Sequence, residues 1–456
     1  MFEIKSLPKQ DEIWIKATDV VVAHSHPFYD RLKKLLNDNK FGDQVRELCS
    51  EHYRLKGPGQ PGVDPEVYCK MLLIGFYKNI SSEREIAEVC HDSIAIRGFL
   101  GYNLTENTPD HSTLSVIRKR LSSETFDNIF KIMLPVLEKE GLINGKDIGM
   151  DTSVMEANAS LLKLQNRLTG EQYRKYVEKL AKEDGVDTSD PAAVSKYDRK
   201  RKKKVSNEEW VNPHDPDAKI GPTKRGNKRM IYKPEHTVDM ETGAILDARV
   251  QPGDMADSTN LTDRVMQAEM FAAEGLDNGE MDLPLESVTA DKGYYSDNEI
   301  ADLSEYDIHV NIPDRLAVRK LEKLAEDKRK AVEESKRFVS SGEGKALLRK
   351  RGMHIERSFA HVLDSGGMRR TTLRGQENIQ KRYIISALAY NISLVMYKIF
   401  GYGTPRQYAA GNESALFFGF LRYEKAYICF FLLQVVDSAI FQIIYAHVNV
   451  SGKESC

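Results

Sequence analysis

Apolar residues recur at helical spacing through the first part of the chain, residues 1 to about 140. In residues 64–79 (DPEVYCKMLLIGFYKN), Val67, Met71 and Ile74 lie three and four positions apart, which predicts one buried helix face. Residues 81–101 (SSEREIAEVCHDSIAIRGFLG) begin at serines that suit a helix cap and end at a glycine that suits a helix stop. We therefore expect an all-α N-terminal region.

A basic helix is predicted within residues 108–123 (TPDHSTLSVIRKRLSS). Ser112 is its expected N-cap, and Leu114 begins its apolar face. Three consecutive basic residues are expected on its exposed side: Arg118, Lys119 and Arg120. Two short helices followed by a basic one, joined by Gly and Pro turns, are typical of helix-turn-helix DNA-binding domains. An ordinary helical bundle with a solvated basic face gives the same pattern, so spacing alone leaves both interpretations open.

The pattern changes at residue 142, where short alternating segments replace long helical ones. A predicted turn at Asn144-Gly145 leads into a short strand that carries Asp151. Residues 235–250 (EHTVDMETGAILDARV) have the pattern of a hairpin turning at Glu241-Thr242-Gly243. Residues 257–275 have the pattern of a capped amphipathic helix that ends at a glycine.

A carboxylate stands at the tip of the next predicted strand, in residues 285–300 (LESVTADKGYYSDNEI). The apolar run ends at Asp291, a turn follows, and Ser296 and Glu299 have the S-x-x-E spacing of a capping box. Another strand is predicted within residues 306–313 (YDIHVNIP). This order predicts an α/β fold, a mixed sheet flanked by helices. Asp151 and Asp291 are expected near the middle of that sheet, at the edge where ligands of open α/β sheets bind.

Two polar segments interrupt this region, and an apolar tail follows it. Residues 160 to about 230 are rich in Lys, Asp and Pro, and residues 317–351 form a charged helical stretch. In the tail, residues 426–448 (AYICFFLLQVVDSAIFQIIYAHV) are long enough for a membrane span, but Asp437 near their centre disfavours one. A buried or self-associating helix is expected instead, with no membrane partner.

Composition is that of a soluble globular chain. Of 456 residues, 41% are hydrophobic and 29% are charged, and the net charge of −2 means that a polyanion would have to be bound by local basic clusters. The five cysteines are scattered and include no C-x-x-C pair, which argues against a disulfide framework or a zinc site and favours a reducing cytoplasm. The N-terminus has no apolar core of a secretion signal.

A third acid, Glu356, lies in a predicted helix within residues 353–376 (MHIERSFAHVLDSGGMRRTTLRGQ). Apolar residues follow it at i+3, i+4 and i+7, which predicts that Glu356 lies on or beside the packed face. Two carboxylates about 4 Å apart repel by about 4 kcal/mol at an effective dielectric constant of about 20, so converging acids need protons or cations between them. Oxygen ligands without His or Cys point to Mg²⁺ or Mn²⁺, and two such ions suit phosphodiester cleavage.

The chain resembles the DDE transposases of bacterial insertion sequences over roughly residues 40–400. Its N-terminal part resembles their helical domain in residues 70–101 and 108–121. The catalytic motifs occur in the expected order: GMDTSVMEANAS, HTVDMETGAILDARVQPGDMADS, VTADKGYYS, HIERSFAHV, GMRRTTLRG and ALAYNISLVMYKIF. The number of motifs and their order make the resemblance specific.

The resemblance implies a ribonuclease H-like catalytic domain at residues 141–400, preceded by a helical DNA-binding domain at residues 1–140 and followed by a tail at 401–456. Asp151, Asp291 and Glu356 would then be the catalytic residues and the ligands of Mg²⁺ or Mn²⁺, with two ions expected. The implied activity is strand cleavage and strand transfer on double-stranded DNA, at the terminal inverted repeats of the element and at target DNA. A homo-oligomer acting in the bacterial cytoplasm is also implied.

One signature of this family is not intact. In the pattern Tyr-x₂-Arg-x₃-Glu-x₆-Lys, Gly352 occupies the Arg place, with Arg351 one position early, and Leu363 occupies the Lys place. Two other functions therefore stay open: a catalytically inactive DNA-binding protein derived from a transposase, and a metal-dependent hydrolase of another substrate. Three intact acids argue against the first, and the helical N-terminal region and basic segments argue against the second.

Several further polar residues have simpler explanations than catalysis. Glu299 is expected in a capping box, Glu377 in a solvent-facing salt bridge, and Asp254 and Asp257 at a turn and an N-cap. His236 beside the first hairpin strand is expected to be structural rather than catalytic.

The segment after the Glu356 helix is basic, and Arg369, Arg370 and Arg374 follow that helix closely enough to hold DNA phosphates. We favour that role over solvated charge. Trp210 in the first polar segment has two open roles, stacking on an unpaired base or pinning its own loop.

Overall fold

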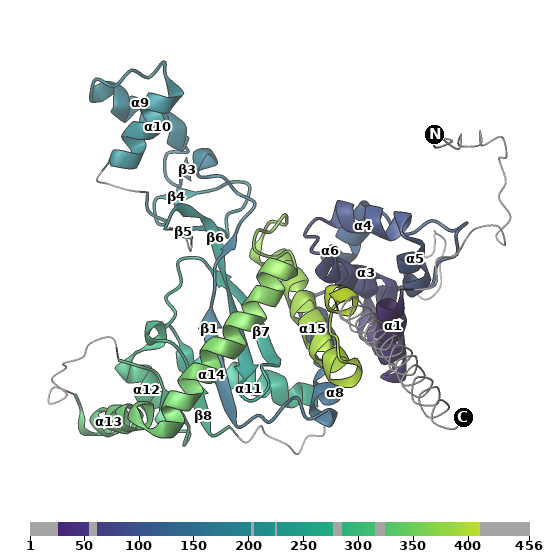
Figure 1. Cartoon of the computed structure of the whole chain (residues 1–456). Coiled ribbons are helices and arrows are strands. Elements are labelled where there is room, and N and C mark those ends of the chain that lie inside the picture. The colour runs from purple at the N-terminus through teal and green to yellow at the C-terminus, as the bar shows by residue number, and fades with distance from the viewer. Residues whose placement is uncertain are drawn as a thin grey trace, which may run out of the picture.

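The computed structural model describes residues 26–53, 62–201, 205–223, 226–276, 285–314 and 324–410. It is a mixed α/β structure in which a helical N-terminal region lies beside a mixed sheet, as the sequence predicts (Figure 1). The predicted apolar helix at residues 426–448 lies outside the described residues.

Helices follow one another through the described residues between 27 and 139, which confirms the prediction of a helical region there. The basic helix α6 is capped by Asp110 rather than by Ser112, because Asp110 Oδ1 accepts a hydrogen bond from the Thr113 N–H at 2.8 Å. Ser93 divides one predicted helical stretch into α4 and α5. The bounds are α1 (Pro27–Asp38), α2 (Phe41–Cys49), α3 (Pro65–Tyr77), α4 (Glu83–Asp92), α5 (Ile94–Leu100), α6 (His111–Arg120), α7 (Ser123–Lys131) and α8 (Leu134–Lys139).

The sheet has parallel strands on one side of β1 and an antiparallel hairpin on the other. β8 pairs parallel with β1, and β9 pairs parallel with β8. β6 pairs antiparallel with β1 and with β7, and the short strands β2 and β5 also pair with β6. The strands are β1 (Asp147–Thr152), β2 (Met155–Glu156), β5 (Lys219–Pro222), β6 (Lys228–Asp239), β7 (Ile245–Pro252), β8 (Ser287–Thr289) and β9 (His309–Asn311).

Asp239 joins the two predicted turns at the end of the hairpin. Its Oδ1 accepts hydrogen bonds from the N–H groups of Glu241 and Thr242, and its Oδ2 accepts from those of Asn144 and Gly145. The start of β1 and the β6–β7 turn are thereby fixed to each other, because one carboxylate satisfies donors in both.

Helix α14 (Gly342–Phe359) crosses one face of the sheet over β1 and β6 (Figure 1). The approach is close at Gly149, where a Cβ would lie 2.5 Å from Met240 Sδ and 3.1 Å from Ile355 Cδ1. Glycine there permits the helix to lie on the strand that carries Asp151. Three further helices that pack around this sheet are α11 (Leu261–Leu276), α12 (Asp297–Ser304) and α13 (Glu326–Ser340).

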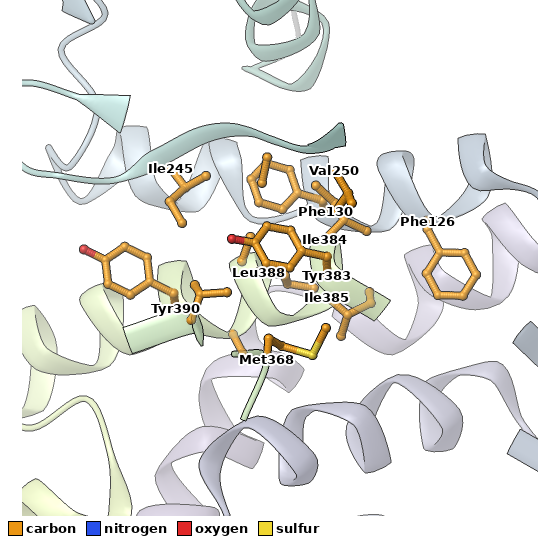
Figure 2. Packing of buried hydrophobic residues seen from close by; sticks show 14 of the residues in the cluster. Phe126, Phe130, Ile245, Val250, Met368, Tyr383, Ile384, Ile385, Leu388 and Tyr390 are labelled. Atoms are coloured by element: carbon orange, nitrogen blue, oxygen red, sulfur yellow. The ribbon is translucent and has the colours of Figure 1, made fainter. Parts of the chain in front are cut away.

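Helix α15 (Gln376–Phe400) connects the N-terminal helices to the sheet. It packs on α3 and α7 and also runs along β7. Figure 2 shows Ile384, Ile385 and Leu388 of α15 among Phe126 and Phe130 of α7 and apolar residues of β7. By length and composition, the helical run Gln376–Ala410 could cross a membrane, but most of its apolar window is buried inside the protein, as expected of a core helix.

The first polar segment forms a projection that carries two helices at its tip, α9 (Tyr173–Glu183) and α10 (Pro191–Lys200) (Figure 1). The two short strands β3 (Gln165–Asn166) and β4 (Trp210–Val211) lie at its base. Trp210 is buried there, and its ring centroid lies 5.2 Å from those of Tyr173 and Tyr176. Of its two open roles, these contacts support pinning of the loop.

Candidate active site

Asp151 and Asp291 lie at equivalent positions of neighbouring parallel strands. Gly149 of β1 is paired with Thr289 of β8, and each acid comes two residues later. Asp151 Oδ1 accepts a hydrogen bond from its neighbour Thr152 N–H at 2.8 Å. Asp291 begins a tight turn, in which its Oδ1 accepts from the Gly293 N–H at 2.5 Å. The strand register therefore brings the two predicted acids together, as the sequence indicated.

The surroundings of the Asp151 carboxyl group disfavour its charged form. Burial raises its pKa to about 6; the Arg351 guanidinium opposes this shift, and the nearby Asp291 carboxylate adds to it. Arg351 Nη1 lies 2.7 Å from Asp151 Oδ2. The ion pair with Arg351 shows that the two acids attract positive charge. Carboxylate oxygens are hard ligands, which suit Mg²⁺ or Mn²⁺.

Glu356 does not join this pair in the structure. The face of α14 that packs on the sheet is formed by other residues, including Ile355 and Ser358, whereas Glu356 is exposed. The expectation that Glu356 lies on or beside the packed face is therefore wrong, because both Glu356 and the next residue, Arg357, are exposed. In the described parts of the chain, no three His, Cys, Asp or Glu side chains are arranged to hold one metal ion.

The helix geometry explains this error. Ala360 at i+4 is exposed, and a π-helical turn over Ala360–Ser365 follows α14 directly. A π turn has wider residue spacing than an α-helix, so the i+7 position, Leu363, is buried without placing Glu356 on the same face.

Asp257 is a polar residue near the pair whose position the sequence did not predict. Its Oδ1 accepts hydrogen bonds from Thr152 Oγ1 and Lys233 Nζ, both at 3.0 Å. Asp257 also lies close to Gly293, in the turn that Asp291 begins. A Cβ atom added to Gly293 would lie 3.2 Å from Asp257 Oδ2. Asp257 lies in a turn, but it does not cap α11 as expected, because that helix begins only at Leu261. No local spacing signals its contact with Lys233, which lies 24 positions earlier on strand β6.

Glu299 caps a different helix from the one expected. Ser296 makes no side-chain capping hydrogen bond at the start of α12, so the predicted capping box is absent. Glu299 Oε2 instead accepts from the N–H and the hydroxyl of Thr262, at 2.7 and 2.9 Å, at the start of α11. This carboxylate therefore joins two helices that are separated in sequence.

Two other expectations are confirmed. His236 is fully buried: its Nδ1 lies 2.8 Å from Ser358 Oγ, its Nε2 lies 2.7 Å from the Tyr383 hydroxyl, and its ring stacks on Phe359. Burial lowers its pKa to about 3, so it is a neutral structural residue. Glu377 is exposed and its Oε1 lies 2.6 Å from Lys381 Nζ, so the carboxylate faces solvent in a salt bridge as expected, although the lysine is buried.

The predicted exposed basic face of α6 lacks one of its three residues. Arg118 is only 6% exposed and forms an ion pair with Glu83, and its Nε donates to Asn378 Oδ1 of α15 at 3.2 Å. Its expected exposure is therefore wrong. Lys119 and Arg120 are exposed, and the Arg120 guanidinium lies over the Tyr53 ring.

The basic segment after α14 lies along β2, four to five residues beyond Asp151. The Arg369 carbonyl accepts from the Glu156 N–H, and the Thr371 N–H donates to the Glu156 carbonyl, each at 3.0 Å. Arg370 and Arg374 are exposed, whereas the Arg369 guanidinium pairs with Asp364 and donates to the Val154 carbonyl. Two of the three predicted arginines are thus open to a ligand beside the strand that carries Asp151.

A cavity of about 630 Å³ lies on the other face of the sheet and is not part of this site. Met150, whose side chain points away from that of Asp151, lines it together with Glu235, Arg249 and Arg264, and neither Asp151 nor Asp291 contributes. The acid pair instead lies at the ends of the strands.

Two family models match the chain. A transposase domain (DUF772) matches residues 17–120, and a transposase DDE domain matches residues 192–392. The second match contains Asp291 and Glu356, whereas Asp151 lies between the two matched ranges. No match was found among curated proteins or among solved structures.

Proposed function

The chain belongs to the DDE-type transposases of insertion sequences, and we propose that it binds the terminal inverted repeats of its element and catalyses metal-dependent DNA strand cleavage and strand transfer. The observation that carries this proposal is the placement of Asp151 and Asp291 at neighbouring parallel strand ends. A ribonuclease H-like catalytic domain is part of the proposal, and a mixed sheet with both acids near its middle supports it.

Asp151 and Asp291 would hold Mg²⁺ or Mn²⁺, two ions being proposed. When bound, these ions would activate the attacking water or 3′ hydroxyl and stabilise the leaving oxygen. Backbone hydrogen bonds orient both carboxylates. The Thr152 N–H donates to Asp151, and the Gly293 N–H donates to Asp291. Glu356 is proposed as the third acid, five residues beyond Arg351 on α14, where it faces solvent and is open to DNA.

DNA binding is assigned to two exposed basic groups. Lys119 and Arg120 of α6 are proposed to contact the element ends, and Arg370 and Arg374 are proposed to hold phosphates near the acid pair. Arg118 and Arg369 are proposed to support these groups from within, because both are engaged in ion pairs. A homo-oligomer on DNA, acting in the cytoplasm, completes the proposal.

The test is cleavage of DNA taken from either side of the coding sequence, where the element ends would lie. Full-length protein with Mg²⁺ should nick these fragments at defined positions. Asp151→Asn and Asp291→Asn should each reduce nicking by more than the about 10- to 100-fold that changes to outer-shell residues cost. Both variants should still shift the DNA in a gel, because phosphate contacts elsewhere supply the affinity.

A matched control is Asp254→Asn, which removes an exposed acid of the same region that is not in the pair. It should cleave like wild type. The separation of Glu356 from the acid pair keeps one alternative open, a DNA-binding protein that no longer cleaves. Specific gel shifts without nicks at any Mg²⁺ or Mn²⁺ concentration would establish that alternative and reject the enzymatic proposal.

A further inference from the structure

Arg351 of helix α14 contacts Asp151, one member of the acid pair. Its Nη1 lies 2.7 Å from Asp151 Oδ2, although the two residues are 200 positions apart in the chain. Both side chains are mostly enclosed, with 18% of Arg351 and 24% of Asp151 exposed. The contact is therefore part of the packed site rather than a surface ion pair.

The guanidinium uses little of its bonding capacity. One nitrogen, Nη1, contacts Asp151, while the buried Nε–H has no hydrogen-bond partner within the described residues. Arginine holds a carboxylate most strongly through two parallel hydrogen bonds, which this geometry lacks. A guanidinium held by one hydrogen bond loses less free energy on leaving the carboxylate than one held by two parallel hydrogen bonds.

Arg351 contacts the Asp151 oxygen that is not bonded to the adjacent backbone. The Thr152 N–H donates to Oδ1, at 2.8 Å, so Oδ2 has more free lone-pair capacity for a cation once Arg351 leaves it. The Asp291 carboxylate on the next strand adds negative charge, which a cation at Oδ2 offsets. A divalent ion and the guanidinium compete for this oxygen, because two cations at one carboxylate oxygen repel each other.

We propose that Arg351 is a placeholder cation, which neutralises Asp151 while the site holds no divalent ion and leaves Oδ2 when an ion binds. This inference rests on the proposed function, because it takes Asp151 to be a metal ligand. It assigns Arg351 a positioning role that acts through Asp151. Removing the guanidinium should therefore strengthen metal binding, whereas structural damage would weaken it.

The test is a Mn²⁺ titration of the full-length protein without DNA. The electron paramagnetic resonance signal of free Mn²⁺ measures how much of the ion is unbound at each point. Arg351→Gln should lower the Kd about three- to thirtyfold, the span expected between exposed and well-enclosed charge pairs. Arg351→Lys keeps the charge and should stay close to wild type. Arg349→Gln removes an exposed arginine from the same helix and should change the Kd by less than about twofold.

The outcomes separate the two proposals. If wild type binds Mn²⁺, Asp151→Asn does not, and Arg351→Gln binds no more tightly than wild type, the placeholder role is wrong while the proposed function stands. If wild type and Asp151→Asn bind Mn²⁺ equally and neither cleaves DNA, the proposed metal site itself is wrong. Circular dichroism melting of Arg351→Gln shows that the variant is folded at the titration temperature. Tighter binding by a folded variant supports the placeholder role.

Discussion

The Asn391 side chain of α15 takes the place of a neighbouring strand for Ile245 of β7. Its Oδ1 accepts from the Ile245 N–H at 2.9 Å, and its Nδ2 donates to the Ile245 carbonyl at 2.8 Å. Gln380, three helical turns earlier, does the same for the other end of β7, accepting from the Val250 N–H and donating to the Ala248 carbonyl. Two side-chain amides thus form hydrogen bonds with backbone groups on the outer edge of β7. Those groups are then not available to pair with a strand of another chain.

Asn391→Leu should destabilise the protein by about 2–4 kcal/mol, because it leaves a buried N–H and a buried carbonyl unsatisfied while nearly preserving volume. Urea unfolding measures the change. Asn37→Leu, at an exposed position of α1, is the matched control and should stay within about 0.5 kcal/mol of wild type. Equal stability of the two variants would show that β7 does not depend on this amide.

Arg118 should matter for stability rather than for DNA contact. Arg118→Gln leaves Glu83, whose side chain is 10% exposed, without its ion-pair partner and should cost about 3–5 kcal/mol. The double variant Lys119→Gln, Arg120→Gln should keep the melting temperature, weaken binding to the element ends, and lower the salt slope of log K by about 2. Fluorescence anisotropy at several salt concentrations and thermal melting separate these effects. If folded Arg118→Gln lost as much DNA affinity as the double variant, Arg118 would have to contact DNA.

Glu356→Gln should strongly reduce strand cleavage without changing stability, because the carboxylate is exposed and would act only on a ligand. Mn²⁺ should restore part of the activity, since it tolerates poorer coordination. Glu377→Gln, which removes another exposed acid together with its salt bridge to Lys381, is the control and should cleave normally. The reverse result, with Glu377→Gln inactive and Glu356→Gln normal, would remove Glu356 from the proposed site.

Glu235 should make stability depend on pH. It is 4% exposed on β6, and burial raises its pKa to about 7 although Arg264 Nη1 lies 2.6 Å from its Oε1. A folded-state pKa above the unfolded one means that the folded protein holds the proton more tightly. This contribution to stability is present below pH 4.5 and is lost as pH rises through about 7.

The measurement is the free energy of unfolding in urea at several pH values between 4.5 and 8, for wild type and Glu235→Gln. The stability of wild type relative to the variant should fall by on the order of 3 kcal/mol across this interval. Glu343→Gln, at an exposed acid of α14, should run parallel to wild type. Parallel curves for Glu235→Gln as well would show that this carboxyl group does not titrate differently in the folded state.

The sequence by itself determined the local features of this protein. The turn at Asn144-Gly145, the hairpin around Gly243 and the strand that ends before Asp291 all depend on neighbouring residues, because turn chemistry and alternation with period two are local. For the same reason, the alternating α/β pattern placed Asp151 and Asp291 at strand ends, and the parallel pairing of β1 with β8 then brought them together.

Tertiary structure decided which charged residues are free and which are engaged. Arg118, Lys119 and Arg120 are equivalent in the basic run, but only Arg118 meets α15, which lies some 260 positions later in the chain. Arg351 reaches Asp151 across 200 positions, and Glu299 caps α11 across 37. Helical periodicity determines which side chains share a face of one helix, but not which face packs against the rest of the protein. These partners therefore meet only once the helices pack onto the sheet and onto one another.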